Sequence, residues 1–463
     1  MEKISVFEIF KIGVGPSSSH TIGPWRAAES FLKRLTEAGH LITDITDIKV
    51  ELFGSLAKTG KGHGTDLACV LGLMGENIET VDVDTVIPSF EKVMEEGEIT
   101  LAGQHTLPFL KNAQLIFNFD VTQEYHANAL EFTATLKNGK NFSHMYYSIG
   151  GGFIQRHGSD EQQSDSKAEI PFPVNRADDL LKWSKQEKRS FAEISMINEL
   201  HWRSHSEIRH GLDRFWQVMK EAVYRGCHTE GTLPGGLNVQ RRAAHIHNQL
   251  INDTDYSSID QWLAQIRQQP KDMMNVTSWV SCFALAVNEV NASYGRIVTA
   301  PTNGAAGVIP AVLMYYYCFN DNICQSDIEN FLLVAGEIGC IFKKGATISA
   351  AAGGCQAEIG VSSAMAAGAL TYVLGGEMSQ CLQAAEMAME HHLGLTCDPI
   401  GGLVQIPCIE RNSMGAMKAI TAANLALHSD ASKARVSLDE VVNSKTKETA
   451  EAGLATNVSM PEC

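Results

Sequence analysis

This chain has 463 residues, enough for about two or three domains, and its 44% hydrophobic and 19% charged side chains are typical of a globular protein. A formal net charge of −16 argues against nucleic acid and anionic membranes as partners. The N-terminal residues lack the apolar segment of a secretion signal, so a cytoplasmic protein is expected.

The first part of the chain alternates between helix and strand patterns. Residues 25–38 predict an amphipathic helix, residues 47–55 alternate as a strand, and residues 65–75 predict a second helix. Further along, Asn138 and Gly139 separate two alternating runs, which predicts a β-hairpin closed by a type I′ turn. We therefore expect an α+β domain over residues 1–154.

The rest of the chain changes character. Residues 155–175 are polar and contain proline, which predicts a linker or a long surface loop. Helical patterns separated by glycine-rich turns then predict an all-helical domain over residues 176–463, ending in a C-terminal tail. The longest uncharged apolar run, 359–374, is rich in Ala, Gly and Ser, which favours a closely packed buried helix over a membrane span.

Eleven cysteines in a chain without a secretion signal argue against a disulfide framework. Cys355, Cys397 and Cys408 are each flanked by Gly or Pro, which free or bend the backbone. Three thiolates can bind three irons of a four-iron, four-sulfur cluster and leave the fourth iron open as a Lewis acid. Alternatively, these cysteines are simply three buried thiols of the hydrophobic core. Five other cysteines lie in apolar helical patterns and are expected to pack as small hydrophobic residues: Cys69, Cys282, Cys318, Cys340 and Cys381.

Two histidines lie in segments that suit ligand binding or proton transfer. Residues 15–24 predict an open helix N-terminus, where backbone N–H groups and the hydroxyls of Ser18 and Ser19 could bind a carboxylate; an ordinary N-cap is the alternative. His20 in this segment could donate or accept a proton. His63 has glycine on both sides, which suits a general base, although a tight loop with a solvated imidazole fits equally.

Other polar side chains stand beside glycines. Ser148 lies shortly before a run of three glycines at 150–152, and Thr302 and Asn303 lie directly before the single glycine Gly304. Such segments offer polar groups and close backbone approach to a small ligand, but they also occur at strand ends and turns. Lys343 and Lys344 suggest a Schiff-base lysine, yet no convincing phosphate-binding segment for a pyridoxal cofactor accompanies them.

Together these segments resemble the bacterial iron-sulfur L-serine dehydratases, also called L-serine ammonia-lyases, of the single-chain type. The similar motifs extend from residue 17 to residue 412: SSSHTIGP, TGKGHGTD, YYSIGGGF, LPGGLNVQRRA, APTNGAAG, SAAAGGCQAEIG and CDPIGGLVQIPCIERN. The resemblance implies an α+β domain akin to a small-ligand-binding regulatory domain, joined to an all-helical catalytic domain. It also implies a homodimeric lyase that converts L-serine to pyruvate and ammonia by Lewis-acid elimination.

The resemblance further implies which residues act. Cys355, Cys397 and Cys408 would hold the 4Fe-4S cluster, and Cys463 on the tail would be a displaceable fourth ligand. His63 is the expected base, with His20 as the second choice. The expected substrate-binding residues are Ser18, Ser19, Ser148, Thr302 and Asn303.

Three alternatives stay open at this point. The first is a pyridoxal-dependent dehydratase in which a lysine carries the cofactor. The second is a non-enzymatic serine or redox sensor, and the third is a related elimination such as cysteine desulfhydration. A preference for serine over threonine is also open, because one methyl group is worth only ~1–3 kcal/mol of discrimination.

Overall fold

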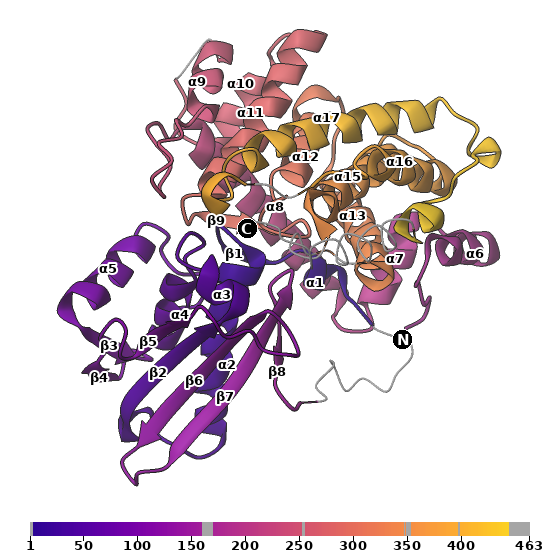
Figure 1. Cartoon of the computed structure of the whole chain (residues 1–463). Helices are drawn as coiled ribbons and strands as arrows, with labels where there is room; N and C mark the ends of the chain where they lie inside the picture. Colours follow the sequence, from indigo (N-terminus) through magenta and orange to yellow (C-terminus); the bar gives the residue numbers. More distant parts are fainter. Residues whose placement is uncertain are drawn as a thin grey trace.

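The computed structural model describes residues 3–159, 170–251, 255–346, 348, 353–396 and 399–443, and it has two halves of different secondary structure (Figure 1). The N-terminal half contains α1 (Val6–Ile9), β1 (Ile12–Val14), α2 (Gly23–Glu37), β2 (Ile45–Phe53), α3 (Gly54–Lys58), α4 (Thr65–Met74), α5 (Val86–Glu96), β3 (Glu98–Leu101), β4 (His105–Pro108), β5 (Leu115–Asn118), β6 (Asn128–Leu136), β7 (Asn141–Gly150) and β8 (Phe153–Arg156).

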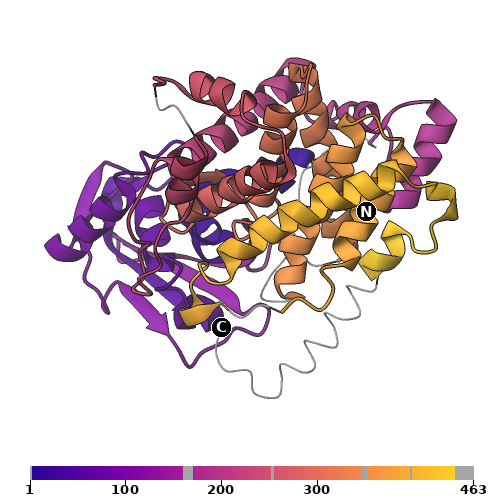
Figure 2. The same cartoon turned by 90° about the horizontal axis from the view of Figure 1, so that it is seen from above.

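The second half is almost entirely helical. It contains α6 (Ala177–Glu187), α7 (Phe191–Glu199), α8 (His205–Cys227), α9 (Ala243–Leu250), α10 (Ile259–Arg267), α11 (Met273–Asn291), β9 (Arg296–Val298), α12 (Val308–Phe319), α13 (Gln325–Gly345), α15 (Ile359–Val373), α16 (Met378–Glu390) and α17 (Cys408–Leu427). Seen from above in Figure 2, the purple N-terminal half lies beside the magenta-to-yellow helical half. The predicted fold class, an α+β part followed by an all-helical part, is confirmed.

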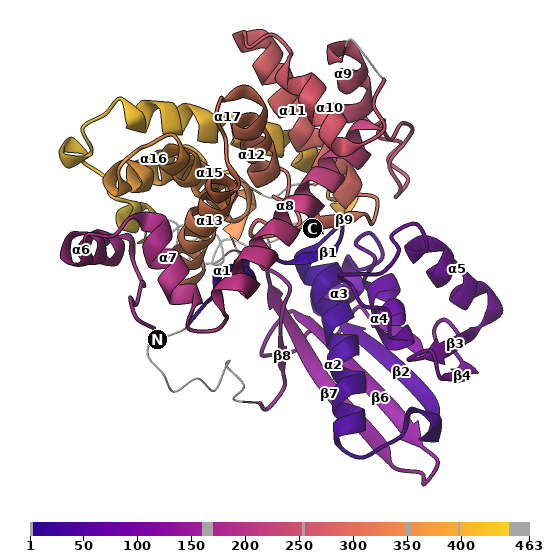
Figure 3. The ribbon, with the colours of Figure 1, turned by 180° about the vertical axis from the view of Figure 1, so that it is seen from behind.

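A five-stranded mixed sheet forms the centre of the N-terminal half. Its order is β5-β2-β6-β7-β8, with β5 parallel to β2 and the other neighbours antiparallel. Helix α2 lies across one face of this sheet (Figure 3). Alternate residues of β2, such as Ile48, Val50 and Leu52, are buried on that face with Phe31 of α2, because strand side chains point alternately to the two sides. This packing accounts for the predicted helix and strand in this region.

The predicted hairpin forms between β6 and β7, but its turn is not type I′. Gly139 has a positive φ of 76° and Asn138 does not, whereas a type I′ turn needs positive φ at both central residues. The N–H of Gly139 donates to the carbonyl of Leu136, and the N–H of Leu136 donates to the carbonyl of Lys140. The loop is therefore longer than predicted, and glycine supplies the left-handed residue that returns the chain to its partner strand.

Helix α15 lies at the centre of the helical half. It contacts α12, α13, α16 and α17, and every residue from Ile359 to Thr371 is buried. Its small side chains let neighbours approach closely: a Cβ atom at Gly368 would overlap the side chain of Ile338. The predicted buried helix is thus confirmed, and no helix in the described part of the chain is long and apolar enough to cross a bilayer.

The five cysteines predicted to pack as small hydrophobic residues are all buried and unpaired by disulfides: Cys69, Cys282, Cys318, Cys340 and Cys381.

The beginning of the chain joins the two halves. β1 pairs antiparallel with β9, and α1 packs against α13. Ile4, Val6 and Phe10 belong to the hydrophobic core of the helical half. Segments that are almost 300 residues apart in sequence therefore meet at the junction, where the Ser18 hydroxyl donates to Oδ1 of Asn303 at 2.7 Å. The boundaries at residues 154 and 175 stay a prediction.

Candidate active site

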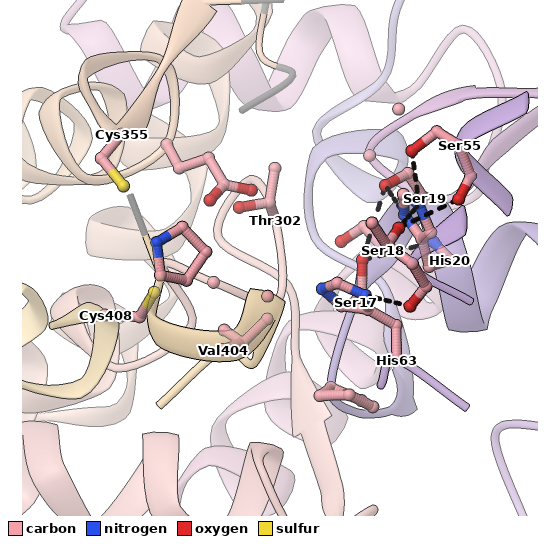
Figure 4. A pocket seen from close by; sticks show the side chains of 18 of the residues that line it. Ser17, Ser18, Ser19, His20, Ser55, His63, Thr302, Cys355, Val404 and Cys408 are labelled. Carbon is pink, nitrogen blue, oxygen red and sulfur yellow. Dashed lines mark hydrogen bonds between the residues drawn. The ribbon is translucent and has the colours of Figure 1, made fainter. Parts of the chain in front are cut away.

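A cavity at the junction is lined by residues from both halves (Figure 4). In the close-up, Cys355 and Cys408 lie on one side, His20 and His63 lie on the other, and Thr302 lies between them. The N-terminal half contributes Pro16, Ser17, Ser18, Ser19, His20, Ser55, Thr59, His63, Gly150 and Gly151. The helical half contributes Thr302, Gly304, Ile348, Cys355, Glu358, Pro399, Gly402, Val404 and Cys408.

Both ring nitrogens of His20 have hydrogen-bond partners. Nδ1 is 2.9 Å from Oγ of Ser19, and Nε2 is 3.0 Å from both Oγ of Ser55 and Oγ1 of Thr59. The Thr59 hydroxyl donates to the carbonyl of Ser55, so it accepts from His20, and this assigns the His20 proton to Nε2. Burial lowers the pKa of His20 well below its usual value, with the nearby His63 as a second cause, so the ring is neutral at pH 7.

His63 presents a different arrangement. Its Nδ1 lies 3.0 Å from the carbonyl oxygen of Thr59, and because a carbonyl only accepts, Nδ1 carries the proton. Nε2 therefore holds a lone pair, and it makes no hydrogen bond to any residue of the described ranges. Thr21 fixes the loop by donating its hydroxyl to the carbonyl of His63 at 2.7 Å. Burial lowers the pKa of His63, and its ring centroid is 4.8 Å from that of His20.

The predicted substrate-binding residues occupy different places. Ser18, Ser19 and Thr302 line the cavity. Asn303 lies behind Ser18 and is completely buried; its N–H donates to the Ser18 hydroxyl at 2.8 Å. Ser148 is buried outside the cavity lining, and its hydroxyl faces the start of α2, where a Cβ atom at Gly23 would overlap it. The structure thus brings three of the five to the cavity wall.

Two of the predicted cluster ligands lie together. Cys355 begins a 3-10 turn, Cys408 begins α17, and both thiols are buried against the cavity. A hydrogen bond with Cys355, followed by burial, raises the pKa of Cys408 well above its usual value, so the two thiols interact directly. Cys397 and Cys463 lie outside the described residues. Among the described residues alone, no group of three His, Cys, Asp or Glu side chains is arranged to hold a metal ion.

The chain on either side of Cys397 also lies at this place. Arg411 donates from Nη1 to Sγ of Cys355 at 2.9 Å and to the carbonyl of Thr396 at 2.9 Å. Pro399, two residues after Cys397, lines the cavity. Two buried thiols that face one cavity and a guanidinium that can balance thiolate charge fit an iron-sulfur cluster, with Cys397 as the third cysteine in the sequence between Thr396 and Pro399.

Comparison with known proteins agrees with this architecture. Residues 5–159 match the family profile described as the serine dehydratase beta chain, and residues 161–455 match that of the serine dehydratase alpha chain. The chain belongs to the serine dehydratase family. Both family parts occur here in one polypeptide, which is the single-chain bacterial type.

Similar relatives cover almost the whole chain. An L-serine dehydratase of Streptomyces coelicolor is 44% identical over 98% of this chain and 99% of its own length. L-serine dehydratase 2 of Escherichia coli K12 is 44% identical, and an L-serine dehydratase of Helicobacter pylori is 41% identical, each over 98% of this chain and 99% of the relative. Both halves are therefore shared with these members of the family.

Sequence reasoning missed three residues of this site that contact the histidines or Cys355. The hydroxyls of Ser55 and Thr59 hold His20, and the backbone carbonyl of Thr59 holds His63. Nothing in the sequence distinguishes these two residues from those of an ordinary helix end. Arg411 touches Cys355 across 56 positions of sequence, a separation that no local pattern reveals.

Glu358 was also missed, and here a signal was present. It is the only acidic residue between Cys355 and the end of α15, a helix that is otherwise uncharged. Its carboxyl lines the cavity, and burial raises its pKa to about 7, with Cys355 as a second cause and the Thr302 hydroxyl opposing the shift. A lone carboxylate at the start of a buried apolar helix is costly unless it serves a purpose, which makes it a marker of a site.

Proposed function

We propose that this chain is an L-serine dehydratase that converts L-serine to pyruvate and ammonia, with a 4Fe-4S cluster held by Cys355, Cys397 and Cys408. Its similarity to L-serine dehydratases over nearly the whole chain supports the reaction. The observation that carries the mechanism is that two buried thiols and the lone pair of a neutral histidine face one cavity. Elimination of water from serine needs a base at Cα and help for a poor leaving group at Cβ, and these are the two functions that such a cavity combines.

His63 is the base in this proposal. Its Nδ1 proton is held by the carbonyl of Thr59, so Nε2 is free to accept the α-proton of serine. Because burial lowers the pKa of His63, the ring is in its neutral, basic form at pH 7. His20 is less suited to this role, since Ser19, Ser55 and Thr59 already engage both of its nitrogens.

Other residues orient the substrate. Ser19 and Thr302 are at the cavity wall, and we assign them to the carboxylate and amino groups of serine. Ser18, Asn303 and Ser148 act as positioning residues, because Ser18 is occupied by Asn303 and Ser148 supports the start of α2. When bound, a cluster with three thiolate ligands supplies a Lewis acid that helps the β-hydroxyl to depart. The product of elimination, aminoacrylate, tautomerises to an imine and hydrolyses to pyruvate and ammonia in water.

The proposal also includes a role for the C-terminal tail and an oligomeric state. We propose that Cys463 would be a displaceable fourth ligand of the cluster when serine is absent, and that the enzyme is a cytoplasmic homodimer. A Cys463→Ser variant should then lose any lag in activation and change its apparent affinity for serine. Equal lag and affinity in the variant and the parent would remove this role.

One experiment tests the proposed function directly. The protein is purified without oxygen, iron and acid-labile sulfide are counted, and pyruvate is measured at once with L-serine, L-threonine and L-cysteine as separate substrates. About four irons and four sulfides per chain, with pyruvate formed from L-serine and lost on exposure to air, are expected. A fully loaded protein that forms no pyruvate would favour a sensor instead.

A pyridoxal mechanism has less support. No lysine is among the described residues that line the cavity. Lys344 donates to the carbonyl of Val174 at 2.7 Å, and Lys343 lies against the ring of Phe153. Two results together would support the pyridoxal mechanism instead: a lysine adduct trapped with borohydride, and activity that survives the removal of iron.

A further inference from the structure

A second cavity lies on the far side of the three glycines at 150–152. It is bounded by α1, β1, α2, the start of β8 and α8. Its charged lining consists of Lys11, Arg26, Arg203, Arg214, Glu8 and Glu79, which is an excess of two positive charges. The whole chain has a formal charge of −16, so this concentration of cations runs against the overall composition.

Lys11 is the deepest of these cations. Its side chain is almost completely buried, Nζ donates to the carbonyl of Gly151 at 2.7 Å, and Nζ lies 3.0 Å from the centre of the Phe153 ring. Lys343 approaches the same ring from α13, at 5.1 Å. Burial lowers the pKa of Lys11 well below its usual value, and Arg26 is the second cause. A nearby anion would stabilise the charged form of such a buried amine.

Both carboxylates of the cavity already have ion-pair or hydrogen-bond partners. Glu79 is shared between Arg26, at 3.9 Å, and Arg214, at 3.0 Å. Glu8 accepts from the backbone N–H of Ser5 at 2.8 Å. Arginines that share one carboxylate keep N–H groups available for a second anionic partner, because each guanidinium has five donors.

Arg203 completes the opposite wall. Its Nη1 donates to the Ser5 hydroxyl at 3.0 Å and to Glu199 at 3.2 Å, and the guanidinium stacks 4.4 Å from the ring of Phe7. Burial raises the pKa of Glu199 to about 7. This wall therefore adds a fixed cation and an apolar surface.

We propose that this cavity binds a small anion with carboxylate or phosphate oxygens, held by Lys11, Arg26, Arg203 and Arg214. The site is separate from the proposed catalytic cavity, but both touch the same glycines: Gly151 lines the catalytic cavity and Gly152 lines the anion cavity. The Lys11–Gly151 hydrogen bond spans the wall between them.

The test measures binding and not turnover, so its result is independent of the proposed function. Inorganic phosphate and pyruvate are titrated separately into the full-length protein, purified without oxygen, by calorimetry at constant ionic strength. We expect one saturable site per chain for at least one of the two anions, and the two arms show whether phosphate or carboxylate is preferred. Arg214→Gln should weaken that binding about tenfold or more, because a charge-assisted contact is lost.

A matched control lies on the same helix. Arg209 is also on α8 and also has a carboxylate partner, Glu329 at 3.3 Å, but it does not line the cavity. Arg209→Gln should therefore bind the anion like the parent. If Arg214→Gln does not fold, Arg203→Gln tests the opposite wall in the same way. The proposal would be wrong if neither anion shows saturable binding. It would also be wrong if Arg209→Gln and Arg214→Gln weaken anion binding equally.

Discussion

The backbone carbonyl of Thr59 accepts a hydrogen bond from Nδ1 of His63 at 3.0 Å. This one contact determines which nitrogen of the ring can act as a base, because it holds the proton on the side of the ring away from Nε2. The Thr59 hydroxyl, by contrast, binds His20. A single residue at the end of α3 thus sets the orientation of both histidines in the cavity.

Replacement of the proposed base should remove most of the catalytic rate. We expect His63→Ala to lower kcat by ~10²–10⁴-fold, the usual contribution of a positioned general base, with cluster absorbance unchanged. Steady-state pyruvate formation under anaerobic conditions measures this. His391→Ala is a suitable control, because Nδ1 of the exposed His391 also bonds a carbonyl four residues earlier, that of Met387 at 2.7 Å. Near-parental turnover of His63→Ala would exclude His63 as the base.

The pH dependence of catalysis should reflect the burial of His63. A base works only when it is deprotonated, so kcat/KM falls as pH falls through its pKa. Burial lowers the pKa of His63 from 6.5, and the acid limb of the kcat/KM profile should therefore lie below pH 6.5. An anaerobic pH series with L-serine checks this. An acid limb centred above pH 6.5 that persists in His63→Ala would point to a different group.

Loss of the Ser18 hydroxyl should reduce stability. Ser18→Ala removes the acceptor of the Asn303 N–H and the donor to its Oδ1, and both groups are fully buried. An unsatisfied buried polar group costs ~1–3 kcal/mol, so the free energy of unfolding should fall by about this amount. Chemical denaturation of the parent and the variant measures the difference.

A comparison within the same region distinguishes a positioning role from substrate binding. Ser30→Ala on α2 removes a hydroxyl that is only half-buried and should change stability by less than about 0.5 kcal/mol. If Ser18→Ala leaves stability equally unchanged and raises only KM for serine, Ser18 contacts the substrate and is not a positioning residue.

Arg411 should help to retain the proposed iron-sulfur cluster. Its guanidinium contacts Sγ of Cys355 and ties the chain before Cys397 to the same place. Outer contacts of this kind typically change metal affinity by ~10–100-fold, so Arg411→Gln should lose iron to a ferrous chelator faster than the parent. The rate of chelate formation and the iron content after anaerobic reconstitution measure this effect.

The control for that experiment is the exposed Arg435, which lies outside the cavity. Arg435→Gln should retain iron like the parent. Equal rates of iron loss in the parent and in Arg411→Gln would show that the contact with Cys355 does not stabilise the cluster.

Local patterns in the sequence determined the elements of this protein. The amphipathic period of α2, the alternation of β2 and the small residues of α15 each predict the element that forms, because these patterns follow the geometry of one helix or strand. The turn at Gly139 shows the limit of such reasoning. Its position was predicted, but its type depends on the φ of Asn138, which the pairing of whole strands decides.

The tertiary structure alone decided which of these residues meet. Three contacts of the site join segments that are far apart in the sequence: the Thr59 hydroxyl with His20, Arg411 with Cys355, and Asn303 with Ser18. The last of these joins the two halves at the junction where β1 pairs with β9. Ser148 shows the converse, since its motif matched a binding segment while its hydroxyl faces Gly23. Distances between elements depend on how buried surfaces fit together, and no periodicity along one segment encodes that fit.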